Sequence, residues 1–341
     1  MNDLTPERER VAHFNRILAP FQGPDLRRSL TQLAVSAVGF VSLWYAMLRS
    51  LEISYALTLL LAIPASGFLV RLFMIQHDCG HGSFFRSRRM ASFVGHWISV
   101  LSLLPYDYWK KSHALHHAHS GDLDLRGFGD VETLTVEEYL ALTGSGRLAY
   151  RIYRHPFVLF GIGALWHFLL RQRFPWGVPR SWHRAWRSIW LTNLSLVLVV
   201  GAMMLAVGWQ RFLLVHAPIV VLSCAVGGWL FYVQHQFEDT YWERNPDWDY
   251  YDAALKGSSH LVLSGPLRWF TASIGLHHVH HLSPRIPNYR LKECYEANEE
   301  LQAATKVTIR NSMELLRLHL WDAEAGRLIG FRELESRTSA G

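Results

Sequence analysis

Four long apolar runs constrain this chain more than any other feature of its sequence. Each run approaches or exceeds the roughly 20 residues that an α-helix needs to cross a hydrocarbon core about 30 Å thick. The runs are Leu30–Leu48, Ile53–Ile75, Ile189–Gly208 and Phe212–Gln234. Because lipid cannot satisfy exposed backbone groups, a run of this length predicts a transmembrane helix rather than a loop or an open strand.

Short links pair the four runs. Residues 49–52 separate the first two runs and residues 209–211 separate the last two, so each pair predicts a helical hairpin. Two shorter apolar stretches, Met90–Leu104 and Phe157–Leu170, are marginal for a span. We interpret them as interfacial or re-entrant helices.

The distribution of charge predicts how the hairpins are oriented. Half of the residues are hydrophobic and only 18% are charged, with a net charge of +6. The two tight links carry only Arg49 and Arg211, whereas the N-terminal, central and C-terminal regions carry nearly all other Lys and Arg residues. The positive-inside rule places these three regions in the cytoplasm. We therefore expect an integral membrane protein without a nucleic-acid partner.

The same features predict the domain organisation. Residues 1–29 form a cytosolic N-terminal segment, residues 30–310 a membrane domain, and residues 311–341 a cytosolic C-terminal tail. The N-terminal segment is polar and rich in Arg, which is atypical of a cleavable signal peptide.

Three histidine-rich boxes follow or separate the apolar runs. Box one is His77-Asp-Cys-Gly-His81, box two is His113-Ala-Leu-His116-His117, and box three is His277-His278-Val-His280-His281. Residues at positions i, i+3 and i+4 share one face of an α-helix, so each box can direct two or three imidazoles at a common point. Box one follows the second run and box three lies beyond the fourth. Both hairpins therefore deliver histidines to the same cytoplasmic surface.

The number of imidazoles indicates a pair of metal ions. Eight are more than one tetrahedral zinc ion can use. The candidate ligands are His77, His81, His113, His116, His117, His277, His280 and His281, with His235 at the end of the fourth run as a ninth. Imidazole binds Zn, Cu, Fe and Ni, so the ligand type alone leaves the metal open. His119 and His278 do not fit the repeated spacing, and we expect neither to be a ligand.

Carboxylates near the boxes are candidates for orienting these histidines. A metal-bound histidine usually donates its other N–H to a carboxylate or a carbonyl group. The candidates are Asp78, Asp107, Asp122, Asp124, Asp130, Glu238 and Asp239.

The motifs resemble those of the membrane fatty acid desaturase family. The segment 77–85, the segment 113–124 and the segment 231–238 resemble the family's first box, its second box and the segment that supplies its extra ligand. The segment Ile274–Tyr289 is similar to the third box of bacterial acyl-lipid desaturases, in particular those of Δ12 type. His119 and His260 depart from the residues that the family pattern predicts there. The resemblance covers roughly residues 30–310.

The resemblance implies an all-α integral membrane fold: four transmembrane helices in two hairpins under a cytosolic helical cap that holds a di-iron site. It implies that the nine histidines ligate two iron ions. It further implies O2-dependent formation of a cis double bond, of Δ12 type, in a lipid-linked fatty acyl chain at a bacterial inner membrane. We expect the two electrons to come from a separate ferredoxin or cytochrome b5-type donor, since the sequence shows no His-Pro-Gly-Gly signature of a fused cytochrome b5.

Three other functions compete with this interpretation. Acyl-chain hydroxylases and related di-iron membrane oxygenases use the same boxes and transfer oxygen instead. A metal transporter needs polar residues in mid-span, and the runs offer few beyond Asn193 and His216. A haem-binding membrane protein would place paired histidines within its spans, whereas these boxes lie beyond them.

Overall fold

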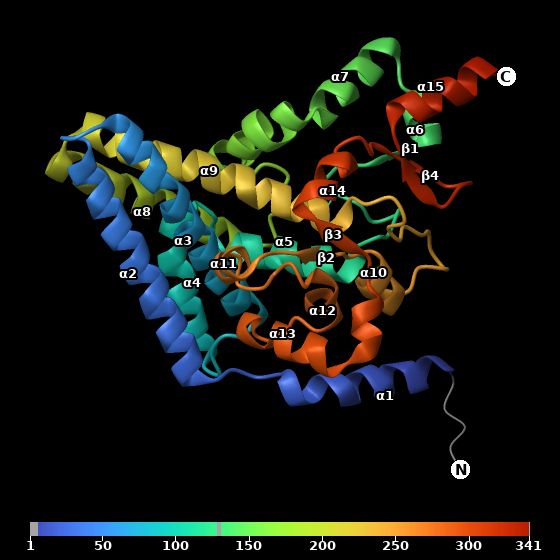
Figure 1. Ribbon diagram of the computed structural model, residues 1–341, viewed down its shortest axis with the longest axis horizontal. Coiled ribbons are helices and arrows are strands. Elements are labelled where there is room, and N and C mark those ends of the chain that lie inside the picture. The colour runs from blue at the N-terminus through green and yellow to red at the C-terminus, as the bar shows by residue number, and fades with distance from the viewer. Residues whose placement is uncertain (1–5, 128–130, 341) are drawn as a thin grey trace.

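A computed structural model of the chain describes residues 6–127 and 131–340, and this part is mostly helical (Figure 1). Within it, four helices are long and apolar enough to cross a membrane: α2 (Leu26–Ser50), α3 (Tyr55–His81), α8 (His183–Val207) and α9 (Trp209–His235). They coincide with the four predicted runs. Helix α3 continues past its apolar run to His81, so box one lies within the last turns of a helix.

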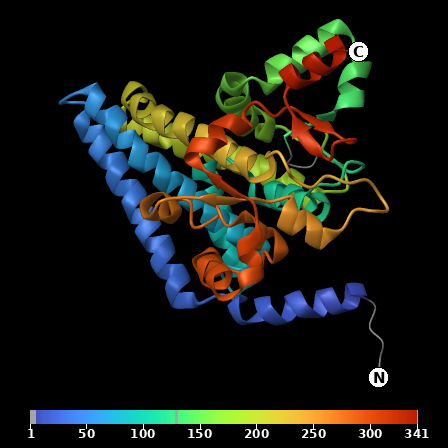
Figure 2. The ribbon, with the colours of Figure 1, turned by 45° about the vertical axis from the view of Figure 1, so that its right-hand side comes forward.

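The four helices form the two predicted hairpins. Helix α2 packs against α3, α8 packs against α9, and α3 and α9 pack against each other to join the hairpins (Figures 1 and 2). The sequence determines where α2 and α3 begin, because the side chains of Asp25 and Ser54 accept backbone N–H groups of their first turns.

Gly82 ends α3 directly after box one. Its φ of 73° lies in the left-handed region that glycine adopts without steric cost, and its N–H is bonded to the carbonyls of Asp78 and Cys79. The chain therefore leaves α3 one residue after His81, and box one stays at the very end of the helix.

Shorter helices form a cap around the ends of α3 and α9. The α-helices of the cap are α1 (Pro6–Leu18), α4 (Arg88–Ser102), α5 (Tyr106–His119), α6 (Val136–Ala141), α7 (Gly144–Arg154), α10 (Tyr250–Lys256), α11 (Gly265–Phe270), α12 (His277–Leu282), α13 (Asn288–Ala297), α14 (Ile309–Leu315) and α15 (Phe331–Ala340). The π-helical or 3-10 turns are η1 (Ala19–Phe21), η2 (Phe157–Gly163), η3 (Trp166–Leu170), η4 (Arg171–Arg173) and η5 (Glu299–Ala303). Helix α4 covers most of the stretch 90–104, and η2 and η3 cover most of the stretch 157–170.

Two small sheets join distant parts of the cap. One has the strand order β1 (Leu134–Thr135), β4 (Leu320–Asp322), β5 (Arg327–Ile329), with β1 parallel and β5 antiparallel to β4. The other pairs β2 (His260–Val262) in parallel with β3 (Lys306–Thr308). The predicted all-α class is confirmed as a mostly helical fold, and these strands are an addition. They were not predicted because two or three residues are too few for an alternating pattern.

The segment 311–341 contains β4, β5 and α15. Its residues Leu320, Ile329 and Leu334 are buried together with Tyr139 of α6 and Tyr150 of α7. The segment therefore packs against the central region to form a C-terminal lobe of the cap.

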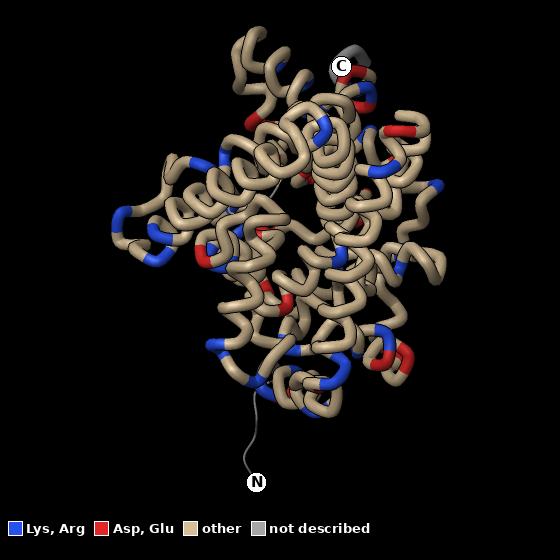
Figure 3. The backbone as a smooth tube through the Cα atoms, turned by 90° about the vertical axis from the view of Figure 1, so that its left-hand side faces the viewer, with Lys and Arg blue, Asp and Glu red and all other residues tan. Residues whose placement is uncertain are grey.

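Much of the surface of the long helices is apolar. Val197 of α8 is 71% exposed and Leu205 is 91% exposed. Long stretches of the helical bundle carry neither basic nor acidic residues (Figure 3). Exposed apolar surface of this extent is rare on soluble proteins, so it fits contact with lipid.

Candidate metal centre

Four helices bring the nine predicted histidines together. The last two turns of α3 carry box one, α5 carries box two, α9 ends at His235, and α12 carries box three (Figure 1). His235 and box three are 42 residues apart in the chain, and boxes one and three are about 200 apart. Their association is therefore a product of the tertiary fold.

The nine imidazoles form two groups. Group A contains His77, His81, His113, His117 and His280. Group B contains His116, His235, His277 and His281. Within each group, one nitrogen from every ring lies within 4.8 Å of the others. The groups adjoin, since the rings of His117 and His281 stack with their centroids 4.1 Å apart.

The division into groups differs from the simplest expectation for each box. Box two contributes His113 and His117 to group A but His116 to group B, and box three contributes His280 to group A but His277 and His281 to group B. The i, i+4 pairs stay together because they are stacked one turn apart. The i+3 residue is rotated away and faces the other group. Boxes two and three thus each serve both groups.

The ring nitrogens converge at a spacing that suits metal ligation. In group B, His277 Nε2 lies 2.9 Å from His235 Nε2 and 3.1 Å from His281 Nε2. In group A, His117 Nε2 lies 3.1 Å from His113 Nε2 and 3.0 Å from His280 Nε2. Two nitrogens bound at right angles to one ion at about 2.0–2.1 Å lie about 2.9 Å apart. The residues therefore fit two metal ions, one in each group.

Burial keeps five of these imidazoles neutral. The pKa values of His113, His117, His277, His280 and His281 are held well below the usual range, first by burial and then by neighbouring imidazoles. A neutral imidazole has a free lone pair for a metal ion, whereas an imidazolium has none.

Asp78 orients His77. Its Oδ1 accepts a hydrogen bond from His77 Nδ1 at 3.1 Å, and its Oδ2 accepts two from Asn288, from the backbone N and from Nδ2, both at 2.8 Å. With Nδ1 protonated, the lone pair of His77 is on Nε2. Asn288 was not among the predicted site residues. Its place within the segment Ile274–Tyr289, which resembles the family's third box, is the signal that the sequence offers.

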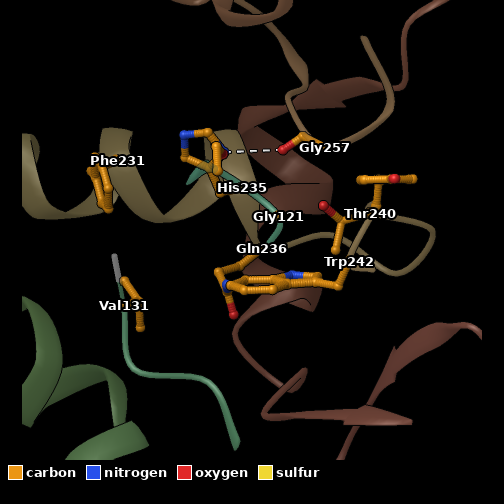
Figure 4. Close-up of a pocket in the computed structure, with 10 residues that line it drawn as sticks. Gly121, Val131, Phe231, His235, Gln236, Thr240, Trp242 and Gly257 are labelled. Atoms are coloured by element: carbon orange, nitrogen blue, oxygen red, sulfur yellow. Dashed lines mark hydrogen bonds between the residues drawn. The ribbon is translucent and has the colours of Figure 1, made fainter. Parts of the chain in front are cut away.

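His235 is oriented by a backbone carbonyl. Its Nδ1 donates to the carbonyl of Gly257 at 3.0 Å, as Figure 4 shows. The Nε2 lone pair of His235 is thereby directed to His277. Figure 4 also shows the small cavity beside this bond, lined by Phe231, Gln236 and Trp242 among others.

Aromatic side chains wall the two groups. The indole of Trp109 stacks on the ring of His113 with centroids 4.6 Å apart, and the ring of Phe231 lies 5.2 Å from that of His116. Box one has a glycine where Trp109 approaches, because a Cβ at Gly80 would lie 2.9 Å from the indole.

The other predicted histidines lie outside the groups. His119 is near Asp122, with 3.9 Å between Nδ1 and Oδ2. His278 is fully buried and its Nε2 is bonded to the carbonyl of Leu301 at 2.8 Å. His260 lies beside His278, with ring centroids 6.0 Å apart.

Of the carboxylates predicted to orient histidines, Asp78 contacts a residue of the groups. Asp107 pairs with His96, Asp122 bonds to the Asp124 backbone, and Glu238 pairs with Arg327. Asp130 lies outside the described residues.

Comparisons with known proteins identify the family. The family model described as fatty acid desaturase matches residues 53–311, which include all nine histidines of the two groups. The chain belongs to the fatty acid desaturase family. It is 44% identical over 329 residues to a fatty acid desaturase of Bacillus subtilis (strain 168), covering 95% of this chain and 93% of that protein.

More distant desaturases are also similar. The sn-1 oleoyl-lipid 12-desaturase of Synechocystis sp. is 26% identical, over 80% of this chain and 74% of that protein. The sn-1 acyl-lipid omega-3 desaturase (ferredoxin) of the same organism is 28% identical, over 83% of this chain and 78% of that protein. The chain is thus a membrane-bound desaturase, an oxidoreductase acting on lipids, with histidine clusters that could bind metal.

Proposed function

We propose that this desaturase introduces a cis double bond into a lipid-linked fatty acyl chain in an O2-dependent reaction at an all-histidine di-iron centre. The observation that carries the proposal is the convergence of nine imidazoles in two adjoining groups. The expected ligands are His77, His81, His113, His117 and His280 for one iron, and His116, His235, His277 and His281 for the other.

The overall reaction converts –CH2–CH2– into –CH=CH–. One O2, two electrons and two protons are consumed with the two hydrogens of the substrate, and two molecules of water are formed. No side-chain acid or base can remove hydrogen from an unactivated methylene group. Two bound irons would supply that oxidative chemistry with O2.

The residues of the chain then have three tasks. Burial excludes water and keeps the imidazoles of His277 and His280 neutral. Asp78 and the Gly257 carbonyl hold the rings of His77 and His235 with Nε2 unprotonated. Trp109 and Phe231 pack against the rings of His113 and His116 and restrict their rotation.

The finer assignments extend the same proposal. A Δ12-type position on a lipid-linked chain is supported by the box-three segment Ile274–Tyr289 and by the similarity to an oleoyl-lipid 12-desaturase. A separate ferredoxin or cytochrome b5-type donor is supported by the similarity to a ferredoxin-dependent desaturase. The positive-inside distribution supports an active site on the cytoplasmic side of a bacterial inner membrane.

The test is expression of the full chain in a host with a compatible reductant, followed by mass spectrometry of the membrane lipids. Loss of two hydrogens from acyl chains is expected. Addition of one oxygen would support an acyl-chain hydroxylase instead, and unchanged lipids with a working donor would contradict both functions.

Two variants connect the activity to the histidine groups. His116→Ala removes a ligand of group B and should abolish desaturation and lower the iron content. His119→Ala, three residues away but outside both groups, should retain both. Full iron and full activity in His116→Ala would contradict the ligand assignment.

A further inference from the structure

A small cavity lies beside His235, where Nδ1 of its ring donates to the carbonyl of Gly257 (Figure 4). The other ring nitrogen, Nε2, lies 2.9 Å from Nε2 of His277 in group B. The cavity therefore borders the hydrogen bond that orients this ligand. About 10 Å³ of it is open to the centre of a water molecule, which is about the space that one water needs.

The lining of this cavity combines apolar walls with buried polar side chains. Phe231 and Trp242 are two of its apolar residues. Three of its polar side chains are those of Ser120, Gln236 and Thr240, which are 5%, 2% and 3% exposed. An ordered internal water makes about three hydrogen bonds to polar groups. The cavity therefore has both the size and the polar lining of a water site.

The hydroxyl of Thr240 lacks a partner from the protein. Its Oγ1 is buried and makes no hydrogen bond within residues 6–127 and 131–340. Figure 4 shows this hydroxyl turned toward the carbonyl of Gly257. Buried side-chain polar atoms almost always have a partner, which can be a protein group or an ordered water. Since Thr240 lines the cavity, a water there supplies the partner that these residues do not.

The carbonyl of Gly257 can accept a second hydrogen bond. A carbonyl oxygen has two lone pairs, and His235 Nδ1 engages one of them at 3.0 Å. The residue must be glycine, because a Cβ would overlap the carbonyl oxygen of Ala253. The chain thus packs closely against Gly257 and leaves its carbonyl between His235 and the cavity.

The amide of Gln236 offers a further donor to the cavity. Its Oε1 accepts hydrogen bonds from Thr133 Oγ1 at 3.2 Å and from Arg154 Nη2 at 3.0 Å. These two bonds occupy the amide oxygen, so the NH2 group is the end that can donate to a water. Thr133 and Arg154 thereby fix the orientation of the amide.

We propose that this cavity binds one ordered water molecule that connects Thr240 to the Gly257 carbonyl and thereby positions His235. The Thr240 hydroxyl donates to the water, the water donates to the carbonyl oxygen of Gly257, and the NH2 group of Gln236 donates to the second lone pair of the water. The carbonyl, held by two donors, keeps Nδ1 of His235 protonated and the lone pair on Nε2. Thr240 is thus a positioning residue, which acts on the ligand through a water and a carbonyl. The inference rests on the proposed function, in which His235 is a metal ligand, and adds the network that orients this ligand.

The water site can be observed directly. A crystal structure of the iron-loaded full chain, at a resolution that shows ordered waters, should contain one water within about 2.5–3.2 Å of both Thr240 Oγ1 and the Gly257 carbonyl oxygen. Thr240→Val keeps the shape of the side chain and removes the hydroxyl, so its structure should lack this water. A wild-type structure without this water, or an unchanged water in Thr240→Val, would overturn the inference.

Iron affinity measures the effect on His235 without turnover. The iron-loaded full chain is titrated with a chelator, and the iron retained per chain is counted. Removing a direct orienting partner lowers metal affinity by about 10–100-fold, and Thr240 acts one step further away, so Thr240→Val should weaken the binding of one of the two iron ions by about 3–10-fold. Thr240→Ser keeps the hydroxyl and should retain the wild-type affinity. Thr58→Val removes a buried hydroxyl near the start of α3, at the other end of the helix from box one, and should leave the iron affinity unchanged.

The outcomes separate this inference from the proposed function. If the wild type holds two iron ions and Thr240→Val holds both as tightly, the inference fails and the proposed function stands. An equal loss of affinity in Thr240→Val and Thr240→Ser would show an effect of packing without a role for the hydroxyl, and would also overturn the inference. If the wild type contains the water but binds neither iron nor another metal ion, the proposed di-iron centre fails, and the positioning role of Thr240 fails with it, whereas the water site itself stands.

Discussion

Substitution of Asp78 by Asn tests how the tertiary structure sets the state of one ligand. The carboxylate accepts three hydrogen bonds, one from His77 Nδ1 and two from Asn288, and it is 2% exposed. An amide has a single acceptor oxygen. If that oxygen faces Asn288, the amide NH2 faces His77, whose Nδ1 must then become the acceptor and whose Nε2 must carry the proton. The nitrogen that converges with group A would lose its lone pair.

The opposite orientation of the amide is no better. It preserves the bond from His77 but opposes the two donors of Asn288 with a third donor. A buried unsatisfied donor costs about 1–3 kcal/mol, and hydrogen bonds to a charged acceptor contribute about 1.5–3 kcal/mol. We therefore expect Asp78→Asn to lower the free energy of unfolding by about 2–4 kcal/mol. Loss of such an orienting partner lowers metal affinity by about 10–100-fold.

Asp122→Asn is the matched control. Asp122 is 1% exposed and accepts the backbone N–H groups of Asp124 and Leu125, but it contacts neither histidine group. It should destabilise the protein by a similar amount and leave the iron affinity of the folded protein unchanged. The assays are thermal unfolding and iron per chain after titration with a chelator. Wild-type iron affinity in Asp78→Asn, or an equal loss in both variants, would refute the reasoning.

Three further predictions follow from single contacts. Gly80→Ala should lower the iron content, measured by elemental analysis, because a Cβ would lie 2.9 Å from the Trp109 indole; normal iron would show that the indole moves away. Arg154→Met should lower the melting temperature by several degrees. The buried guanidinium donates hydrogen bonds to the carbonyls of residues 132 and 318, and these carbonyls stay buried when the guanidinium is removed. An unchanged melting temperature would mean that water takes the place of the guanidinium. Burial lowers the pKa of His319 in the folded protein to about 4. In the unfolded chain the same imidazole binds a proton once the pH falls below about 6.5. Protonation therefore favours the unfolded chain, and the free energy of unfolding decreases as the pH falls. Between pH 7 and pH 5, the melting temperature of His319→Gln should fall by less than that of the wild type. Equal decreases in the two proteins would contradict this.

The features that the sequence predicts are those with a local physical cause. The four spans follow from the length of each apolar run, because the bilayer thickness sets how many residues a helix needs. The pairing into hairpins follows from links too short to permit other arrangements. The boxes follow from the helical repeat, which stacks His77 on His81 and His113 on His117. Even His235 was predictable, since its position at the end of a span places it on the same side as the boxes.

The tertiary structure alone decided how these local pieces combine. The division of box three between two groups depends on the rotation of α12 against α5 and α9, and no spacing in the sequence encodes that angle. The partnership of Asp78 with Asn288 joins residues 210 positions apart. The strands β2 and β3 are too short to have a pattern of their own, yet they pair residues 260–262 with residues 306–308 in the cap. The sequence by itself determined that this is a membrane protein with nine histidines at one surface, because hydrophobicity and helical spacing act over neighbouring residues. Which imidazoles fall in the same group and which acid orients His77 were decided by packing between distant segments.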